Sequence, residues 1–329
     1  MEYRGLVAAM VAASSTIKRA AGMIPTALAA SFIVFLLVWI GPNPVQALMN
    51  EGDLDPAAAQ QMQHSYGLDQ PWYDQYASWL ANFASGDLGT SMRTNEPAGS
   101  LILDRIGVTL TIAGTALFLS ILISIPLALL MAERPRSTTD STLTSGAVII
   151  SALPAFLLAL LLQYLAVLIK DATGITIFHA SGGLRDGGII EILQRYTLPI
   201  ATLTAVQVAG WMRYQRGLLL DVIGSEFVTA AHARGVSHRS IRIRHVLRAS
   251  LTPIVTLIAI DLGLLIGGTL IVETVFGLPG TGRLLLDSVQ AHDTVVALDL
   301  IMIGALAIVC ANLVADVLCD RIDPRRRRS

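Results

Sequence analysis

Six apolar stretches of this sequence are each long enough to cross a lipid bilayer as a helix. A bilayer core about 30 Å thick requires about 20 mostly apolar helical residues. The predicted spans are Gly22–Gly41, Ile106–Met131, Thr144–Ile169, Tyr196–Gly217, Leu251–Glu273 and Thr294–Leu318. Such repetition favours an all-α polytopic membrane protein with about six transmembrane helices over a soluble protein with a very apolar core.

The composition agrees with a membrane protein. Only 14% of the 329 residues are charged, whereas a soluble domain has roughly 25%. The net charge of −1 excludes a protein that binds nucleic acid through a basic composition. The two cysteines, Cys310 and Cys319, lie in one apolar run and suggest neither a disulfide framework nor a metal site.

The distribution of Lys and Arg predicts the orientation of the chain. With the N-terminus in the cytoplasm, 17 of the 23 basic residues fall on the cytoplasmic side, as the positive-inside rule requires. The first external segment carries eight acids and two bases. We therefore expect both termini in the cytoplasm, and we read the first apolar run as a retained helix because a signal-peptide core has only about 7–15 residues.

This orientation divides the chain into five parts. We expect a cytoplasmic N-terminal segment, a first transmembrane helix, an external segment with short helices, a five-helix membrane core and a basic cytoplasmic tail. Their respective boundaries are 1–21, 22–41, 42–105, 106–319 and 320–329, with a long cytoplasmic loop at 218–250 inside the core.

The external segment is predicted to contain two short helices, near Pro56–Tyr66 and over Trp72–Phe83. Aromatic residues in the second follow the i, i+3, i+4, i+7 spacing of an amphipathic helix. We interpret this aromatic face as an interfacial anchor rather than a ligand-stacking surface.

The cytoplasmic loop combines a small, apolar stretch with an Arg-rich stretch. Ser225 can cap a helix that begins at Glu226, Gly235 can end that helix in a left-handed conformation, and Ser237 can cap a following basic helix. The arginines could serve only to enforce topology and bind anionic headgroups. The Ala-rich helix and turn instead favour docking into a groove of a partner protein.

The same loop resembles the EAA loop of bacterial ABC-importer permeases, in particular the dipeptide/oligopeptide branch. The resemblance rests on the run Glu226-Phe227-Val228-Thr229-Ala230-Ala231-His232-Ala233-Arg234-Gly235-Val236-Ser237, followed by Ile241, His245, Leu247, Arg248 and Pro253. Three further stretches match: 66–71 with 75–76 and 79–80, then 86–91, and then 267–268 with 272–276, 279–280 and 282–284. Two positions depart from the pattern: Thr229 replaces the naming acidic residue, and Ala249 stands where Asn is common.

The resemblance implies an ABC type I importer-like permease fold and a set of partners. These are a second homologous permease, two cytoplasmic ATPase subunits and an external substrate-binding lipoprotein. The residues that it assigns to ATPase coupling are Glu226, Thr229, Ala230, Ala231, Arg234 and Gly235. Its substrates would be di- or oligopeptides, with nickel or another small solute as the alternative within this class.

Catalytic chemistry is not predicted for this chain. The stretch Gly277-Leu278-Pro279-Gly280-Thr281-Gly282-Arg283-Leu284 lacks the Lys and the hydroxyl of a phosphate-binding loop and falls on the external side. We expect no enzymatic activity, no bound cofactor, no metal site and no nucleic-acid partner, with ATP and Mg bound by the partner subunits. Membrane lipid is the remaining expected contact.

Acidic residues within the predicted spans are candidates for a polar translocation path, because charge is costly in hydrocarbon. Asp261 is the deepest, and Glu273 lies nearer a span end. Structural hydrogen bonds to neighbouring helices are the alternative interpretation. A stand-alone secondary transporter is the rival class; it would need charge relays or inverted repeats, and we find no convincing repeat.

Overall fold

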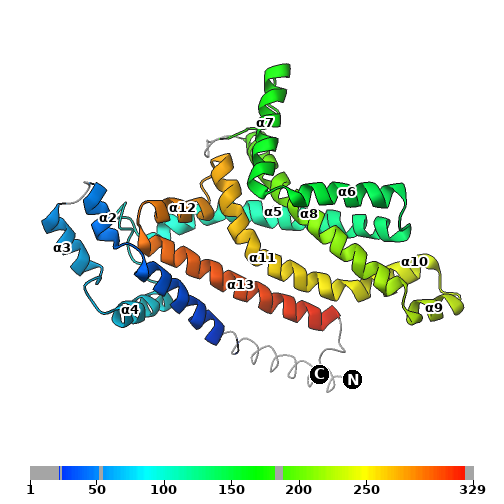
Figure 1. The fold of residues 1–329 in the computed structure, drawn as a ribbon, viewed down its shortest axis with the longest axis horizontal. Coiled ribbons are helices and arrows are strands. Elements are labelled where there is room, and N and C mark those ends of the chain that lie inside the picture. Colours follow the sequence, from blue (N-terminus) through cyan, green and yellow to red (C-terminus); the bar gives the residue numbers. More distant parts are fainter. Residues whose placement is uncertain (1–21, 23, 52–54, 182–187, 323–329) are drawn as a thin grey trace. The chain divides into compact units, whose positions relative to one another are not determined.

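The computed structural model describes residues 22, 24–51, 55–181 and 188–322 (Figure 1). The predicted N-terminal segment 1–21 and most of the predicted basic tail lie outside these residues. Within the described ranges the chain forms helices joined by turns, with one isolated bridge between Thr90 and Pro97 and no strand. The predicted all-α architecture is therefore confirmed.

Two compact units make up the chain. The first comprises Met1–Gly107 and Gly280–Leu313, and the second comprises Val108–Pro279 and Val314–Ser329.

The first unit contains the segment that is predicted to be external. Its elements are a helix over residues 24–40, α2 (Pro44–Glu51), α3 (Pro56–Ser65), α4 (Trp72–Ser85), α12 (Thr281–Gln290) and the adjoining parts of α5 (Ala98–Glu133) and α13 (Thr294–Ile322). Helices α3 and α4 form where the sequence predicts them. Asp55 caps α3 by accepting a hydrogen bond from the backbone N of Ala58 at 2.7 Å, and Gly86 ends α4 with a φ of 86°.

The aromatic face of α4 packs against the first apolar helix. Phe32 lies with its ring centroid 5.4 Å from that of Tyr76, and Phe35 stacks on Trp79 at 6.3 Å. The hydroxyls of Ser31 and Tyr76 are 2.8 Å apart. The aromatic residues of α4 therefore pack on the first predicted span, although Trp72 and Tyr73 stay exposed.

The second unit is built around the long helix α8 (Ile189–Ile223). Helices α6 (Thr138–Ala152), α7 (Ala155–Thr173) and α11 (Arg248–Phe276) all pack against it. Thr202, Thr204 and Gln215 of α8 are buried, as expected for polar residues that face the interior of a membrane helix bundle. Pro199 also lies inside this helix.

Five described helices or helix runs have the length and hydropathy of a membrane span. A sixth is present if Thr269–Phe276 and Thr281–Gln290 together form one span. The five are Ile24–Asn50, Ala98–Glu133, Ala155–Thr173, His238–Leu262 and Thr294–Asp320. The predicted span Tyr196–Gly217 falls within α8, which is outside this set.

The predicted span Thr144–Ile169 is not one continuous helix. It is divided between α6 and α7 at Leu153 and Pro154. Leu153 is extended, with φ −84° and ψ 128°, because a following proline disfavours the α conformation of the residue before it. The apolar run alone does not reveal this break.

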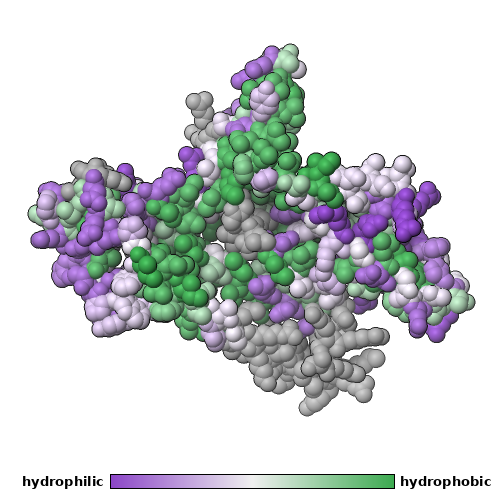
Figure 2. Space-filling model, in the orientation of Figure 1, coloured by the Kyte–Doolittle hydropathy of each residue, from purple (hydrophilic) through white to green (hydrophobic). Residues whose placement is uncertain are grey.

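The surface of the second unit is apolar along α7 and hydrophilic around α9 (Glu226–Ala233) and α10 (His238–Ser240), the elements of the loop predicted to be cytoplasmic (Figure 2). Among the exposed residues of α7 are Phe156, Leu160 and Leu165. Apolar side chains exposed along a helix of this length indicate a surface that faces lipid.

Candidate functional site

The predicted coupling loop forms a short helix, a left-handed turn and a second helical run. Helix α9 starts at Glu226, as predicted, and Ser225 precedes it in an extended conformation. The Ser225 hydroxyl, however, donates to the carbonyl of Val222 instead of accepting from the helix. Ser237 likewise makes no side-chain capping hydrogen bond. The predicted side-chain caps are therefore wrong at both positions, although both serines stand at helix starts.

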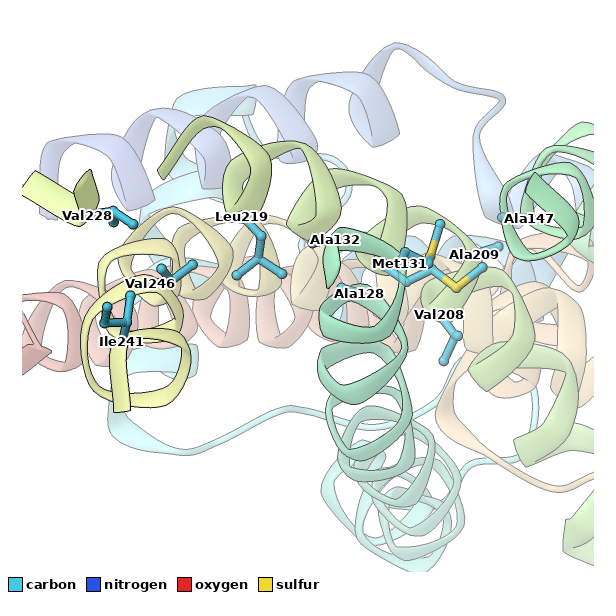
Figure 3. Close-up of a cluster of buried hydrophobic side chains, with 11 residues drawn as sticks. Ala128, Met131, Ala132, Ala147, Val208, Ala209, Leu219, Val228, Ile241 and Val246 are labelled. Atoms are coloured by element: carbon cyan, nitrogen blue, oxygen red, sulfur yellow. The ribbon is translucent and has the colours of Figure 1, made fainter. Parts of the chain in front are cut away.

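One face of α9 is buried in the core of the second unit. Val228 is 3% exposed and packs in a cluster with Leu219 of α8 and with Ile241 and Val246, which follow α9 in the chain (Figure 3). Met131 of α5 belongs to the same cluster. This burial fixes which face of α9 points away from the protein.

The opposite face of α9 carries most of the predicted coupling residues. Exposed residues of this group are Glu226, Thr229, Ala230, Arg234 and Gly235. Ala231 differs, because it is partly buried and packs against the cluster that holds Val228. The structure thus brings five of the six residues to an exposed surface and places the sixth beneath it.

A Schellman motif ends α9. Gly235 has a φ of 76°, its N–H donates to the carbonyl of His232 at 2.9 Å, and the N–H of Val236 donates to that of Ala231 at 3.2 Å. These are the two hydrogen bonds that define the motif. The predicted left-handed conformation of Gly235 is confirmed.

The helical run that follows is less regular than predicted. Helix α10 leads into η1 (Ile241–Leu247), a π-helix, which continues directly into α11. A π-helical segment is rare and is frequent at functional sites. Nothing in the spacing of the arginines indicates it.

Two ion pairs near this loop were not anticipated from the sequence. Arg216 of α8 donates from Nε and a terminal nitrogen to the two carboxylate oxygens of Asp140, at 2.6 and 2.7 Å. Arg242 of η1 pairs with Glu133 at the end of α5. The hydrogen bonds from Arg216 hold the pKa of the Asp140 carboxyl below its ordinary value of about 3.8. No local signal links partners that lie this far apart in sequence.

Both acidic candidates for a translocation path have hydrogen-bond partners on another helix. The indole nitrogen of Trp211 donates to a carboxylate oxygen of Asp261. Thr109 of α5 donates to Glu273, which is fully buried. The structure does not bring Asp261 and Glu273 into one site.

Helices of membrane-spanning length, several of them packed around the polar-faced helix α8, are the architecture of a multi-pass membrane protein. Residues 124–328 match the family described as the binding-protein-dependent transport system inner membrane component, and residues 14–113 match its N-terminal counterpart. The chain belongs to this family, which confirms the resemblance identified from the loop.

Several curated relatives align over nearly the whole chain. The oligopeptide transport system permease protein AppB of Bacillus subtilis is 32% identical over 95% of this chain and 99% of its own length. The glutathione transport system permease protein GsiC of Escherichia coli is 32% identical over 94% and 98%. The oligopeptide transport system permease protein OppB of Mycobacterium bovis is 30% identical over 91% and 94%.

Membership in this family establishes a general role and location. The chain is a permease subunit of an ABC importer and a multi-pass protein of the cytoplasmic membrane. The family works with ATPase and binding-protein components.

Proposed function

We propose that this chain is a permease subunit of an ATP-driven importer for di- or oligopeptides, and that the α9 turn couples it to a cytoplasmic ATPase subunit. The geometry of α9 supports this proposal. Val228 is buried and anchors one face of α9 in the core, while Thr229 and Ala230 are exposed on the other face. Small exposed side chains allow a close approach of another backbone, and the Schellman motif holds the turn in one shape.

The proposal places both termini and the α9 turn in the cytoplasm. The asymmetry of Lys and Arg supports this orientation. A second homologous permease would complete the pathway, two ATPase subunits would bind ATP and Mg, and an external lipoprotein would deliver the peptide. This chain itself would bind no nucleotide and catalyse no reaction.

Peptide as the substrate class is supported by the relatives, since AppB and OppB are named as oligopeptide permeases. Uptake of a radiolabelled dipeptide and a labelled pentapeptide, in a strain that lacks the chromosomal copy of this gene, tests the substrate class. We expect uptake of at least one peptide to depend on the restored gene. Restored uptake of nickel without uptake of either peptide would contradict the peptide assignment.

Substitution of Ala230 by a large residue tests the docking of α9. We expect Ala230→Trp to prevent co-purification of the ATPase subunits and to abolish uptake, because the indole blocks close approach. Ala230→Ser should retain both. Ser141→Trp is the matched control, since Ser141 is also small and exposed but lies on α6. Full uptake by the Ala230→Trp variant would overturn the docking assignment.

Ala231 is a poor position for this experiment, although the sequence assigns it to the same group. Its side chain packs against the buried cluster around Val228. A large residue there would disturb the fold of the chain itself, so loss of uptake would not report on docking.

A further inference from the structure

The turn between α5 and α6 contributes a carboxylate to each flank of the coupling helix. Asp140, near the start of α6, pairs with Arg216, which precedes α9 in the chain. Glu133, at the end of α5, pairs with Arg242, which follows α9. The residues on the two sides of the α5–α6 turn therefore pair with α8, which precedes α9, and with η1, which follows it.

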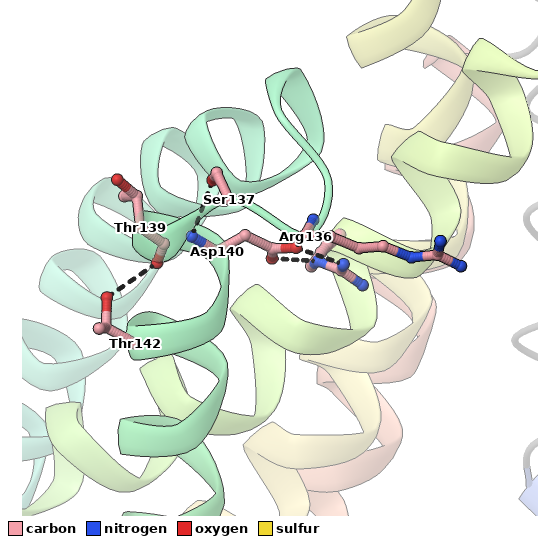
Figure 4. A network of polar contacts seen from close by, with 6 residues as sticks. Arg136, Ser137, Thr139, Asp140 and Thr142 are labelled. Atoms are coloured by element: carbon pink, nitrogen blue, oxygen red, sulfur yellow. Dashed lines mark hydrogen bonds and ion pairs between the residues drawn. The ribbon is translucent and has the colours of Figure 1, made fainter.

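The inner pair has a geometry that fixes position. Asp140 is buried, with its side chain 4% exposed, and both of its oxygens accept from the Arg216 guanidinium. One of them also accepts from the backbone N of Arg136 at 2.8 Å, while Ser137 caps α6 through the backbone N of Asp140 (Figure 4). A bidentate guanidinium–carboxylate contact restrains both distance and orientation.

The outer pair is more exposed. The side chains of Glu133 and Arg242 are 36% and 39% exposed. An exposed pair contributes little to folding stability, so its removal allows a test with little risk to the fold.

Apolar contacts join three of these elements, α5, α8 and η1, to α9. Met131 and Ala132 of α5, Leu219 of α8, Val228 of α9 and Val246 of η1 all belong to one buried cluster. Packed interiors transmit displacement because they resist compression. The ion pairs and the cluster together tie the α5–α6 turn to the coupling loop.

A role in membrane topology does not account for these contacts. The positive-inside rule requires only basic residues on the cytoplasmic side. It requires neither a buried carboxylate at Asp140 nor a fork of two hydrogen bonds to Arg216. Burying a charge is costly unless it is paired, so the pairing has a role beyond orientation.

We propose that the α5–α6 turn is a clamp on the coupling helix, and that Asp140, Arg216, Glu133 and Arg242 are positioning residues that transmit movement of α9 into α5 and α6. This inference rests on the proposed docking of α9 to an ATPase. When the ATPase displaces α9, both ion pairs move together, so α5 and α6 move with the loop. Without the clamp, ATP is hydrolysed but less peptide is moved.

The experiment is a charge exchange at the outer pair, in the complete transporter reconstituted in proteoliposomes with its ATPases and binding protein. Peptide moved per ATP hydrolysed is the readout, since a role limited to folding would change the amount of complex and not this ratio. We expect Glu133→Arg and Arg242→Glu each to lower the ratio at least fivefold. The double variant should return it to within twofold of the starting value.

Arg239→Glu is the matched control, because Arg239 is an exposed arginine of the same loop for which the described residues provide no ion pair. Its ratio should stay unchanged. Arg216→Lys adds a test of the inner pair: it keeps the charge but loses the fork, and we expect a lowered ratio. Unchanged ratios in both single variants of the outer pair, or a double variant that fails to recover, would overturn the clamp.

A cross-link separates failure of the clamp from failure of the proposed function. The Ala230→Cys variant should cross-link to an ATPase subunit, and it should do so equally when it is combined with the clamp substitutions. No cross-link in the Ala230→Cys variant alone would refute docking of α9. A retained cross-link with an unchanged transport ratio would refute the clamp alone.

Discussion

The hydroxyl of Thr109 lies 2.7 Å from a carboxylate oxygen of Glu273, and Glu273 is fully buried. A buried carboxylate in a membrane helix either serves function or holds helices together through hydrogen bonds. The contact joins α5 to α11 within the second unit, which favours the structural role for Glu273.

Glu273→Gln is therefore expected to retain most peptide uptake, because the amide oxygen can still accept from Thr109. Glu273→Leu should lower the amount of assembled transporter, since it removes the acceptor altogether. Uptake normalised to the amount of complex in the membrane provides the measurement. A Gln variant that assembles normally but transports nothing would instead show that the charge of Glu273 is needed in the translocation path.

The contact between Trp79 and Asp299 gives a prediction for stability. The indole nitrogen of Trp79 donates to one oxygen of Asp299 at 3.0 Å, and the other oxygen is buried with no partner among the described residues. Trp79→Phe removes this hydrogen bond to Asp299, so we expect the free energy of unfolding to fall by about 1–3 kcal/mol. Chemical denaturation of the purified protein in detergent measures it.

Phe83→Leu is a suitable control for that variant, because Phe83 lies on the same helix and contacts the Trp79 ring without a role in the hydrogen bond. Equal destabilisation by the two variants would mean that ring packing, not the hydrogen bond, accounts for the loss.

Gly235 provides a test of backbone conformation. Its φ of 76° is the left-handed region, and no atom lies within 4 Å of the position that a Cβ would take. Strain is therefore the cost of substitution there, about 1–2 kcal/mol for an ordinary L-residue. We expect Gly235→Val to reduce uptake and Gly235→Asn to be tolerated better, because Asn adopts this conformation more readily.

Co-purification of the ATPase subunits with each Gly235 variant checks this prediction. If Val and Asn behave alike, the side chain at position 235 matters through its contact with a partner and not through the shape of the turn.

Asp140 predicts a dependence of stability on pH. Its folded pKa lies below the ordinary value of about 3.8 because Arg216 donates to the carboxylate. The stabilisation is complete above about pH 4 and is lost as the pH falls through the lower, folded value. In Asp140→Asn this loss is absent, so the difference in melting temperature from the starting protein should shrink between pH 7 and pH 3.

Arg216→Ala should be more damaging than Asp140→Asn at pH 7. It leaves a buried carboxylate without its partner, which costs about 3–5 kcal/mol in a fully buried pair and less here, since Arg216 is 26% exposed. Melting temperatures of the two variants in detergent at pH 7 make the comparison. Equal or smaller destabilisation by Arg216→Ala would contradict the importance of the buried charge.

Local signals in the sequence predict the parts of the fold that depend on neighbouring residues. Asp55 and Pro56 mark the start of α3, and Gly235 marks the end of α9, because caps and left-handed turns are determined within a few residues. These features need no knowledge of tertiary contacts.

Features that depend on distant residues are not predictable in this way. The pair of Asp140 and Arg216 joins α6 to α8, and the π-helix at Ile241–Leu247 has no compositional mark. Ser225 follows the capping rule by position, yet its hydroxyl finds a carbonyl of α8 instead. The full length of α8 is also not predicted, because its ends at residues 189–195 and 218–223 carry Glu191, Arg195 and Asp221 and so fall outside the apolar run.

The proline within α8 has a mechanical consequence. Pro199 cannot donate a hydrogen bond to the preceding turn, which weakens the helix at that point. The 24 residues from there to Ile223 extend about 36 Å at 1.5 Å per residue. A bend of about 5° at Pro199 would therefore swing the far end of this rod, where α9 is attached, through about 3 Å. A small change of angle at Pro199 would thus displace the end of α8 that leads into α9 by about the size of a side chain.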